Sequence, residues 1–587
     1  MTYRKFGSRV TGGFLALALL LAACGSDDDT SSDGNTATDV DGATSNTATD
    51  VDGATSTDAA GGDTGEPADS GGSDTLVIAI PGTPQGIDVD LQAGPQTWTI
   101  GGQIWELGAE WVRADYPFDA TVADPTAIPG FTYPAFAEAA GGPEYEGNLI
   151  EDCSLSEDGL EATYTLRQGV ISPYGNEFTA DDVLYKAERA LALGAIGAFI
   201  HSAANAADLS KWEKVDDYTV RITGDSPMPI ICSVNANLYW YWLDSTEVQT
   251  HATEEDPWAT EWVGTNGGSF GPYQVTSWNA GSEVVLESNP NYWRGEPSIK
   301  KIIFQVVPES SNRLALLQSG DVDMAEGLSP EEIASLEGSG TAVGGAVRSS
   351  LAIYAVMNNS KAPFDDVNVR RAVNSAIPRD DIVEFVYQGM ANNWQGVIPS
   401  VYPGFVEQDA YGYDMDKAKA YLADSAYPDG FDVTLAYNSG DPVQETLSIL
   451  MQTSLADLGI NVTLESLPPG PHSDYVQSKE ADFALWLDFP IEPDPNYGLT
   501  LLYETDQAVN YQNYSNPTVD ELLKEGRGIV DLQERLKFHE KVQQIVHDDA
   551  PNAWITEPYY LIGVSTDLEG LGWYTTQYYR VSEMTRR

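Results

Sequence analysis

The chain of 587 residues is poor in basic residues, in histidine and in cysteine. Its 30 lysines and arginines stand against 89 aspartates and glutamates, which gives a formal net charge of −59 at pH 7. A chain this acidic repels the phosphates of nucleic acids and the headgroups of anionic lipids, so we expect neither as a partner.

Enzyme signatures are also scarce. The five histidines are scattered and no HExxH sequence occurs, so we expect no histidine-built metal site, no metal and no cofactor. We expect no serine nucleophile elbow. Carboxylates are too abundant for their presence to indicate a glycosidase, so a secreted hydrolase is a remote alternative and we predict that the chain is not an enzyme.

Long apolar runs are missing as well, and the one short run lies near the start of the sequence. Arg4, Lys5 and Arg9 precede an apolar stretch at residues 14–23, which ends in the sequence LAAC at Cys24. This stretch is shorter than the roughly 20 residues that a membrane helix needs. Basic residues, a short apolar run and small residues before a cleavage point are typical of an export signal. LAAC resembles the lipobox of bacterial lipoproteins, in which the cysteine is acylated, so residues 1–24 are predicted to be a lipoprotein signal peptide with Cys24 as the lipid attachment site.

An acidic segment without aromatic or basic residues follows at residues 25–73. It consists mostly of Gly, Ser, Thr, Ala and Asp, and it contains the sequence NTATDVDGATS twice, at residues 35–45 and 46–56. Such a composition buries too little apolar surface to offset the loss of chain entropy on folding. We therefore predict a disordered tether.

The remainder, from residue 74 to residue 587, exceeds the roughly 250–300 residues at which single cores stop growing, so two or more lobes are expected. It holds 77 acidic and 27 basic residues, which fits a cationic ligand or a salty habitat equally well. Its only cysteines are Cys153 and Cys232. In an exported protein two cysteines suggest one disulfide, although two separate buried thiols remain an alternative.

Strand and helix signals alternate along this part of the chain. A β-branched strand is expected within residues 74–84, and Thr179 with Asp182 forms a capping-box pattern before a helix. Ser329 and Glu332 repeat that pattern, with proline at the first helical position. Strands at residues 431–437 and 460–467 flank a helix that ends at Leu458, which predicts a βαβ unit with parallel strands.

A third strand at residues 481–487 runs directly into Asp488. In open α/β sheets, ligands bind beyond the carboxyl ends of the strands. Asp488 and the loop at residues 438–441 are therefore placed at a binding cleft.

Seven blocks, in order along the chain, resemble the bacterial extracellular solute-binding proteins of family 5, the oligopeptide- and dipeptide-binding group that serves ABC importers. They include EDGLEATYTLRQGVISPYGNEFTADDVLYKAERA, GPYQVTSWNAGSEVVLESNPNYWRGEP, MNNSKAPFDDVNVRRAVNSAIPRDDIVEFVYQGM and DDAPNAWITEPYYLIGV. The resemblance implies an α/β, bilobal periplasmic-binding-protein-like fold of class II (cluster C), with two lobes joined by a hinge and a ligand cleft between them. Lobe 1 would be discontinuous, at residues 74–350 plus 556–587, and lobe 2 would cover residues 351–555.

The resemblance also implies a function and a site. The chain would be the substrate-binding component of an ABC importer, a monomer that captures a peptide in the interlobe cleft and delivers it to membrane permease subunits. Its location would be the outer face of the cytoplasmic membrane, with the lipid anchor as its only membrane contact. In peptide-binding relatives, an aspartate shortly after a Trp-bearing strand holds the α-ammonium of the ligand. The best match here is Trp486-Leu487-Asp488, with Glu492 and Asp494 as competitors because extra residues separate the two parts of the motif.

Aromatic residues offer further candidates for the ligand surface, and core packing explains them equally well. They are Tyr239, Trp240 and Trp394. An oligosaccharide, an opine or a metal chelate remains an alternative cargo, and a sensor or scaffold that has lost uptake remains an alternative role. A peptide needs a negative anchor for its ammonium group, whereas a sugar needs aromatic platforms and neutral hydrogen-bonding groups, so Asp488 favours a peptide.

Overall fold

The computed structural model describes residues 74–92, 94–119, 122–135, 144–394, 396–408, 411–488, 492–574 and 578–587. The chain divides into two units, Met1–Ser73 and Asp74–Arg587, and every described residue belongs to the second. The predicted signal peptide, Cys24 and the tether lie outside the described residues. In the described part of the chain, no helix combines the length and apolar character needed to cross a membrane.

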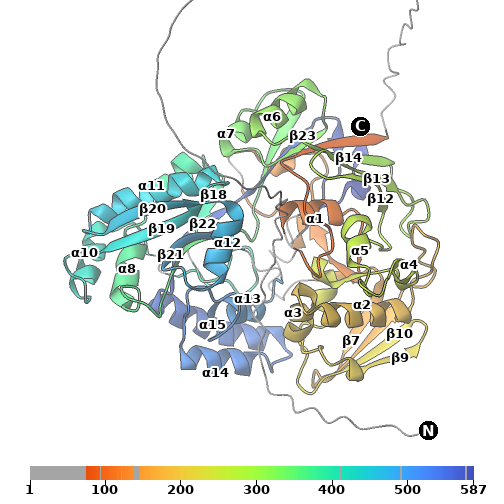
Figure 1. Cartoon of the computed structure of the whole chain (residues 1–587), viewed down its shortest axis with the longest axis horizontal. Coiled ribbons are helices and arrows are strands. Elements are labelled where there is room, and N and C mark those ends of the chain that lie inside the picture. Colours follow the sequence, from red (N-terminus) through yellow and green to blue (C-terminus); the bar gives the residue numbers. More distant parts are fainter. Residues whose placement is uncertain are drawn as a thin grey trace, which may run out of the picture. The chain divides into compact units, whose positions relative to one another are not determined.

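A seven-stranded sheet organises the first lobe and includes a strand from near the C-terminus (Figure 1). Strand β1 pairs in parallel with β14 and β15, and the other neighbours pair antiparallel. In spatial order the strands are β12 (Tyr273–Asn279), β13 (Glu283–Ser288), β14 (Lys301–Val306), β1 (Thr75–Ile80), β15 (Met324–Glu326), β23 (Tyr560–Ser565) and β16 (Ala342–Val347).

A six-stranded mixed sheet organises the second lobe. Its order is β18 (Ala391–Asn393), β22 (Asn552–Pro558), β17 (Ala352–Met357), β21 (Phe483–Asp488), β19 (Asp432–Asn438) and β20 (Asn461–Leu467). Strands β19 and β20 are parallel and flank helix α11 (Pro442–Ala456), which confirms the predicted βαβ unit. The helix ends two residues earlier than predicted. Strand β21 (Phe483–Asp488) runs parallel to β19; the strand predicted at residues 481–487 is confirmed, although it begins two residues later and includes Asp488 as its last residue.

Smaller sheets complete the first lobe. One has four antiparallel strands, in the order β7 (Ile150–Leu155), β8 (Glu161–Leu166), β10 (Thr219–Thr223) and β9 (Trp212–Asp216). The two-stranded sheets pair β2 (Glu106–Leu107) with β11 (Tyr241–Trp242), β3 (Ala109–Trp111) with β6 (Tyr145–Gly147), β4 (Arg113–Ala114) with β5 (Tyr133–Pro134), β24 (Leu568–Glu569) with β27 (Thr585–Arg586) and β25 (Trp573–Tyr574) with β26 (Tyr578–Tyr579).

Helices begin where the sequence places capping residues. At the start of α2 (Ala180–Leu193) the backbone amide of Thr179 donates to Asp182 at 2.8 Å, and at α7 (Pro330–Ala334) that of Ser329 donates to Glu332 at 2.8 Å, so both predicted capping boxes are confirmed. The other α-helices are α1 (Pro95–Gly101), α3 (Ile196–Ala203), α4 (Ser245–Thr250), α5 (Thr260–Asn266), α6 (Ser310–Ser319), α8 (Val367–Ser375), α9 (Arg379–Asp381), α10 (Met415–Ala423), α12 (Pro469–Gln477), α13 (Pro495–Tyr503), α14 (Pro517–Gly526) and α15 (Leu532–Asp549).

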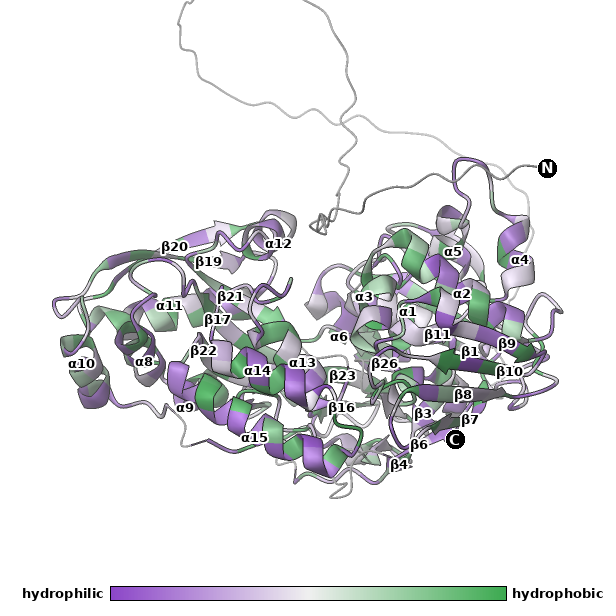
Figure 2. Cartoon of the chain, turned by 90° about the horizontal axis from the view of Figure 1, so that it is seen from below, coloured by the Kyte–Doolittle hydropathy of each residue, from purple (hydrophilic) through white to green (hydrophobic). Residues whose placement is uncertain are grey.

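Both faces of the six-stranded sheet are buried. Alternate side chains of each strand point to opposite faces, and each face packs against helices. On β17, Ile353, Ala355 and Met357 pack into one apolar cluster with residues of α8 and α11, while Ala352, Tyr354 and Val356 pack into a second cluster with residues of α13 and α15. Helices α14 and α15 carry both hydrophobic and hydrophilic residues along their length (Figure 2), as expected for helices with one buried face.

The second cluster also contains Ala109, Trp111 and Ala236, which belong to the chain segments of the first lobe. This face of the six-stranded sheet is therefore the face that meets the first lobe. Two chain crossings link the sheets, between β16 and β17 and between β22 and β23. The predicted lobe boundary between residues 350 and 351 falls between β16 and β17. The predicted boundary between residues 555 and 556 falls within β22. The lobe boundaries themselves stay a prediction.

Candidate ligand-binding site

Asp488 is the last residue of β21 and lies on the sheet face that meets the first lobe. Register shows this directly, because Asp488 is paired with Ala352 and Trp486 with Tyr354, and opposite residues of antiparallel strands share a face. The Asp488 side chain is partly exposed, whereas Leu487 points to the opposite face. A carboxylate at the carboxyl end of a strand, on the interlobe face, can accept hydrogen bonds from a cation in the cleft.

Tyrosines surround this carboxylate from both lobes. Burial raises the pKa of each hydroxyl, and the negative charge of Asp488 raises it further, at Tyr239, Tyr354, Tyr497, Tyr503 and Tyr511. Their hydroxyls therefore stay protonated at neutral pH. These tyrosines are uncharged and aromatic, so a cation brought into the cleft would meet this carboxylate beside neutral rings.

The predicted aromatic residues divide into two groups. Trp486 lies on the same sheet face as Asp488, with its ring centroid 5.3 Å from that of Tyr511, and Trp394 packs against Tyr354 at 6.0 Å. Tyr239 lies near Asp488 and accepts a hydrogen bond from Trp98 Nε1 at 3.1 Å. Trp240 lies apart from these residues, because it is stacked on His201 at 4.1 Å in the core of the first lobe.

Glu492 is a second carboxyl of the interlobe region, and it is only 1% exposed. Ser233 Oγ of the first lobe donates to Glu492 Oε1 at 2.8 Å, while Glu492 Oε2 is buried without a hydrogen-bond partner among the described residues. Burial raises the pKa of Glu492 to about 8, and the nearby charge of Asp494 acts in the same direction. Glu492 is therefore largely protonated at neutral pH, which makes it a poor anchor for a cation.

Asp494 has a structural role. It is the N-cap of α13, where it accepts a hydrogen bond from the backbone amide of Asn496 at 2.9 Å, and its other oxygen is ion-paired with the buried guanidinium of Arg535. Because this charge is already neutralised, Asp494 is less suited than Asp488 to hold a ligand cation. Of the three carboxylates proposed from the sequence, Asp488 has the most suitable surroundings for an ammonium group.

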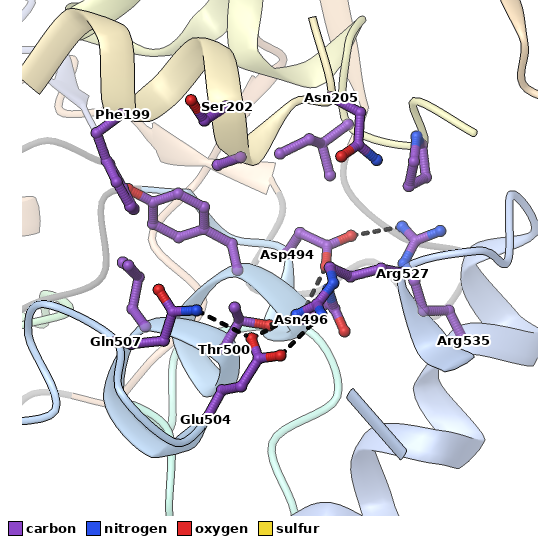
Figure 3. Close-up of a pocket in the computed structure, with 15 residues that line it drawn as sticks. Phe199, Ser202, Asn205, Asp494, Asn496, Thr500, Glu504, Gln507, Arg527 and Arg535 are labelled. Carbon is purple, nitrogen blue, oxygen red and sulfur yellow. Dashed lines mark hydrogen bonds and ion pairs between the residues drawn. The ribbon is translucent and has the colours of Figure 1, made fainter. Parts of the chain in front are cut away.

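A cavity of about 260 Å³ lies between the lobes (Figure 3). The first lobe lines it through α3 and the segment around Ile230, and the second lobe through α13, its following loop, Arg527 and Arg535. Tyr497 belongs both to the cavity wall and to the tyrosines around Asp488.

The disulfide supports the first-lobe side of this site. Cys153 of β7 is bonded to Cys232, with their Cα atoms 5.7 Å apart. Cys232 directly precedes Ser233, the residue that contacts Glu492, and the same segment leads on to Tyr239. The covalent link thus fixes the segment that carries two of the first-lobe contacts.

Two sequence features have no role in this site. Gly267-Gly268-Ser269-Phe270-Gly271 matches the letters of a GxSxG motif, contrary to our expectation. Ser269 is buried, however, and its hydroxyl donates to the carbonyl of Trp242 at 2.6 Å, so it is not an exposed nucleophile. In the described part of the chain, no group of three His, Cys, Asp or Glu side chains is placed to hold a metal ion.

Several residues of the site escaped the sequence analysis. Tyr354, Tyr497, Tyr511 and Ser233 carry no local motif, and they reach the site from four different chain segments. Among these four, only Tyr354 has a usable sequence signal. Ala352 is paired with Asp488, and strand alternation places Tyr354, two residues further on, on the same face of the sheet.

The fold and the site define a two-lobed binding protein that holds its ligand between two α/β lobes. The model of the "Bacterial extracellular solute-binding proteins, family 5 Middle" matches residues 144–510, and the chain belongs to this family, whose members are substrate-binding proteins of transport systems.

Named relatives and solved structures agree with this assignment. The chain is 28% identical over 451 residues, 75% of this chain and 86% of the relative, to the probable D,D-dipeptide-binding periplasmic protein DdpA of Escherichia coli. It is 28% identical over 456 residues, 71% of this chain and 79% of the relative, to heme-binding protein A of Haemophilus influenzae. The structure of the periplasmic binding protein DppA from Helicobacter pylori, in complex with the peptide STSA, has a TM-score of 0.72 at 24% identity and covers 87% of this chain and 98% of that chain. This likeness confirms the bilobal fold.

Proposed function

We propose that this protein is the peptide-binding component of an ABC importer, a non-enzymatic receptor that closes its two lobes on a peptide and presents it to membrane permease subunits. The observation that carries the proposal is the Asp488 carboxylate at the end of β21, which lies among protonated tyrosines on the interlobe face. A peptide supplies the matching group, because its α-ammonium forms charge-assisted hydrogen bonds with a carboxylate. Family membership and a relative named for dipeptide binding support the same cargo.

A panel of four cargo classes tests this proposal. Thermal unfolding of the purified protein is followed with di- to pentapeptides, oligosaccharides, an opine and a nickel–histidine complex, each at the same concentration. A ligand that binds only the folded state raises the unfolding temperature, and the rise grows with the logarithm of the ratio of ligand concentration to Kd. We expect peptides to raise the temperature by several degrees and the other three classes to leave it unchanged. A shift with another class and none with peptides would contradict the peptide assignment.

The proposal includes a lipid anchor at Cys24 and a monomeric receptor on the outer face of the cytoplasmic membrane. The LAAC sequence supports acylation, and the 49 residues that follow Cys24 would act as a flexible tether with an r.m.s. span of about 40 Å. Such a tether keeps the receptor near its permease at a high effective concentration.

Replacing Cys24 with serine tests the anchor in the full chain. Because acyl chains supply the membrane affinity, we expect the wild-type protein in the membrane fraction and C24S in the soluble exported fraction. Ser26→Ala serves as the matched control and is expected to behave as wild type. A wild-type protein of unacylated mass in the soluble fraction would contradict the anchor.

A further inference from the structure

We propose that the interlobe cavity lined by Phe199 and Tyr497 is the specificity pocket of this receptor, and that it takes one uncharged aromatic or large aliphatic side chain of the cargo. The inference rests on the proposed function and adds the class of peptide that binds. Both lobes contribute residues to the cavity wall (Figure 3).

An aromatic and apolar surface forms one part of the cavity wall. Phe199 of α3 and Tyr497 of α13 face each other across the lobes, with ring centroids 6.1 Å apart in an edge-to-face arrangement. Ile230 and Leu501 extend this surface. An apolar side chain placed here would exchange water for contacts with both lobes, so its burial favours the closed state.

The charged groups of the wall are already paired with one another. Arg527 donates to both oxygens of Glu504, at 2.6 and 2.8 Å, and Arg535 is paired with Asp494. Gln507 adds a hydrogen bond to Glu504 at 3.2 Å. A charged cargo side chain would therefore find no free countercharge here and would lose its hydration, whereas a neutral one loses little.

The dimensions of the cavity suit a large side chain. Its volume is about 260 Å³, and a cavity of roughly 150 Å³ is sufficient to bind benzene. A phenylalanine, tyrosine or leucine side chain therefore fits without displacing the walls.

Tyr497 connects the cavity with the region of Asp488. It lines the cavity, and the charge of Asp488 contributes to the raised pKa of its buried hydroxyl. We therefore expect a side chain close to the anchored ammonium to enter the cavity, and the peptides below vary the first and the second position.

Calorimetric titration of the full-length protein with defined tripeptides tests this pocket. The set consists of Ala-Ala-Ala and of tripeptides with Phe, Leu, Asp or Lys at the first or the second position. We expect Phe and Leu, at one of these two positions, to increase the affinity at least tenfold over alanine, and Asp and Lys to decrease it.

Two variants show whether any preference arises in this cavity. In Ala203→Phe a new ring projects from α3 into the cavity, so the preference for Phe and Leu over alanine is expected to disappear. In Phe199→Ala the aromatic wall is lost and the preference is expected to fall several-fold. Ala207→Phe, at an exposed position outside the cavity, is the matched control and is expected to keep the full preference. Thermal unfolding confirms that each variant is folded.

The outcomes separate this inference from the proposed function. Peptide binding without a preference for Phe or Leu, or with a preference that survives in both Ala203→Phe and Phe199→Ala, would overturn the pocket and leave the peptide-binding role intact. A complete lack of peptide binding by the wild type would overturn both.

Discussion

Replacing Asp488 with asparagine is expected to weaken peptide binding about 100-fold or more while leaving the fold intact. The substitution keeps the shape of the side chain and removes the negative charge, so the ammonium of the peptide loses its charge-assisted hydrogen bonds. Truncating one partner of a buried, hydrogen-bonded charge pair costs about 2–5 kcal/mol, and about 3 kcal/mol corresponds to the expected loss. Calorimetric titration of wild type and D488N with the same peptide measures it.

Asp482→Asn is the matched control for this experiment. Asp482 precedes the same strand, β21, at the end opposite to Asp488, where it is exposed and pairs with Lys361 at 3.3 Å. D482N is expected to bind peptide as tightly as wild type. If D488N also keeps wild-type affinity, the ammonium is held elsewhere, and Glu492 and Asp494 become the residues to replace next.

The affinity for peptide is expected to fall as the pH rises from about 5 to 8, because of Glu492. In the closed protein, burial raises the pKa of Glu492 from an ordinary value of 4.5 to about 8. Opening the lobes would expose this carboxyl and return its pKa toward the ordinary value. Between these two values the closed state binds a proton that the open state lacks, so closure becomes less favourable with increasing pH, by at most about 1.4 kcal/mol or tenfold per unit. Below 4.5 both states are protonated and the effect vanishes.

The groups around Glu492 allow this contribution to be isolated. Asp494 raises its pKa further and Arg535 lowers it, while hydrogen bonds from Ser233 and Asn237 favour the charged form; Tyr145, Tyr402 and Tyr497 complete the surroundings and stay protonated in this range. Glutamine at position 492 mimics the protonated carboxyl, so we expect E492Q to bind peptide with a flatter pH profile than wild type.

Ser233→Ala provides the second comparison, since it removes the hydrogen bond across the lobes and keeps the titrating carboxyl. We expect S233A to bind more weakly than wild type at every pH with the same slope. Peptide affinities of wild type, E492Q and S233A, measured from pH 5 to 8, show whether Glu492 titrates with closure. Identical profiles for wild type and E492Q would show that Glu492 does not titrate with closure. Other buried carboxyls with a raised pKa are common to wild type and E492Q and therefore cancel in the comparison; they include Asp182, Glu326 and Glu557, which accept hydrogen bonds from Ser245, Tyr579 and Ser400.

Local sequence signals were sufficient to predict much of the fold. The capping boxes at Thr179 and Ser329 act within four residues, and the βαβ unit follows from hydrophobic periodicity over about 40 residues, so neither depends on distant parts of the chain. The position of Asp488 at the end of a strand also follows from a local signal, the apolar strand residues that precede it. Each of these features was confirmed because its physical cause is local.

The rest of the site depends on long-range contacts that no local pattern encodes. Arg535 neutralises Asp494 from 41 residues away, and Ser233 reaches Glu492 across 259 residues. Tyr239 and Trp240 are neighbours within a short 3-10 helix, Leu238–Trp240, and only the folded structure shows that the first lies near Asp488 while the second packs on His201. The sequence therefore indicated the strand end at Asp488 and left the role of each side chain open.

The central claim is that Asp488 anchors the free ammonium of a peptide, and one calorimetric comparison tests it most directly. The wild-type protein is titrated with a tripeptide, with the same tripeptide acetylated at its N-terminus, and with an oligosaccharide. Acetylation removes the positive charge and leaves the backbone and side chains unchanged. We expect tight binding of the free peptide, at least 100-fold weaker binding of the acetylated peptide and no heat of binding from the oligosaccharide. Equal affinity for both peptides, or binding of the oligosaccharide alone, would contradict the central claim.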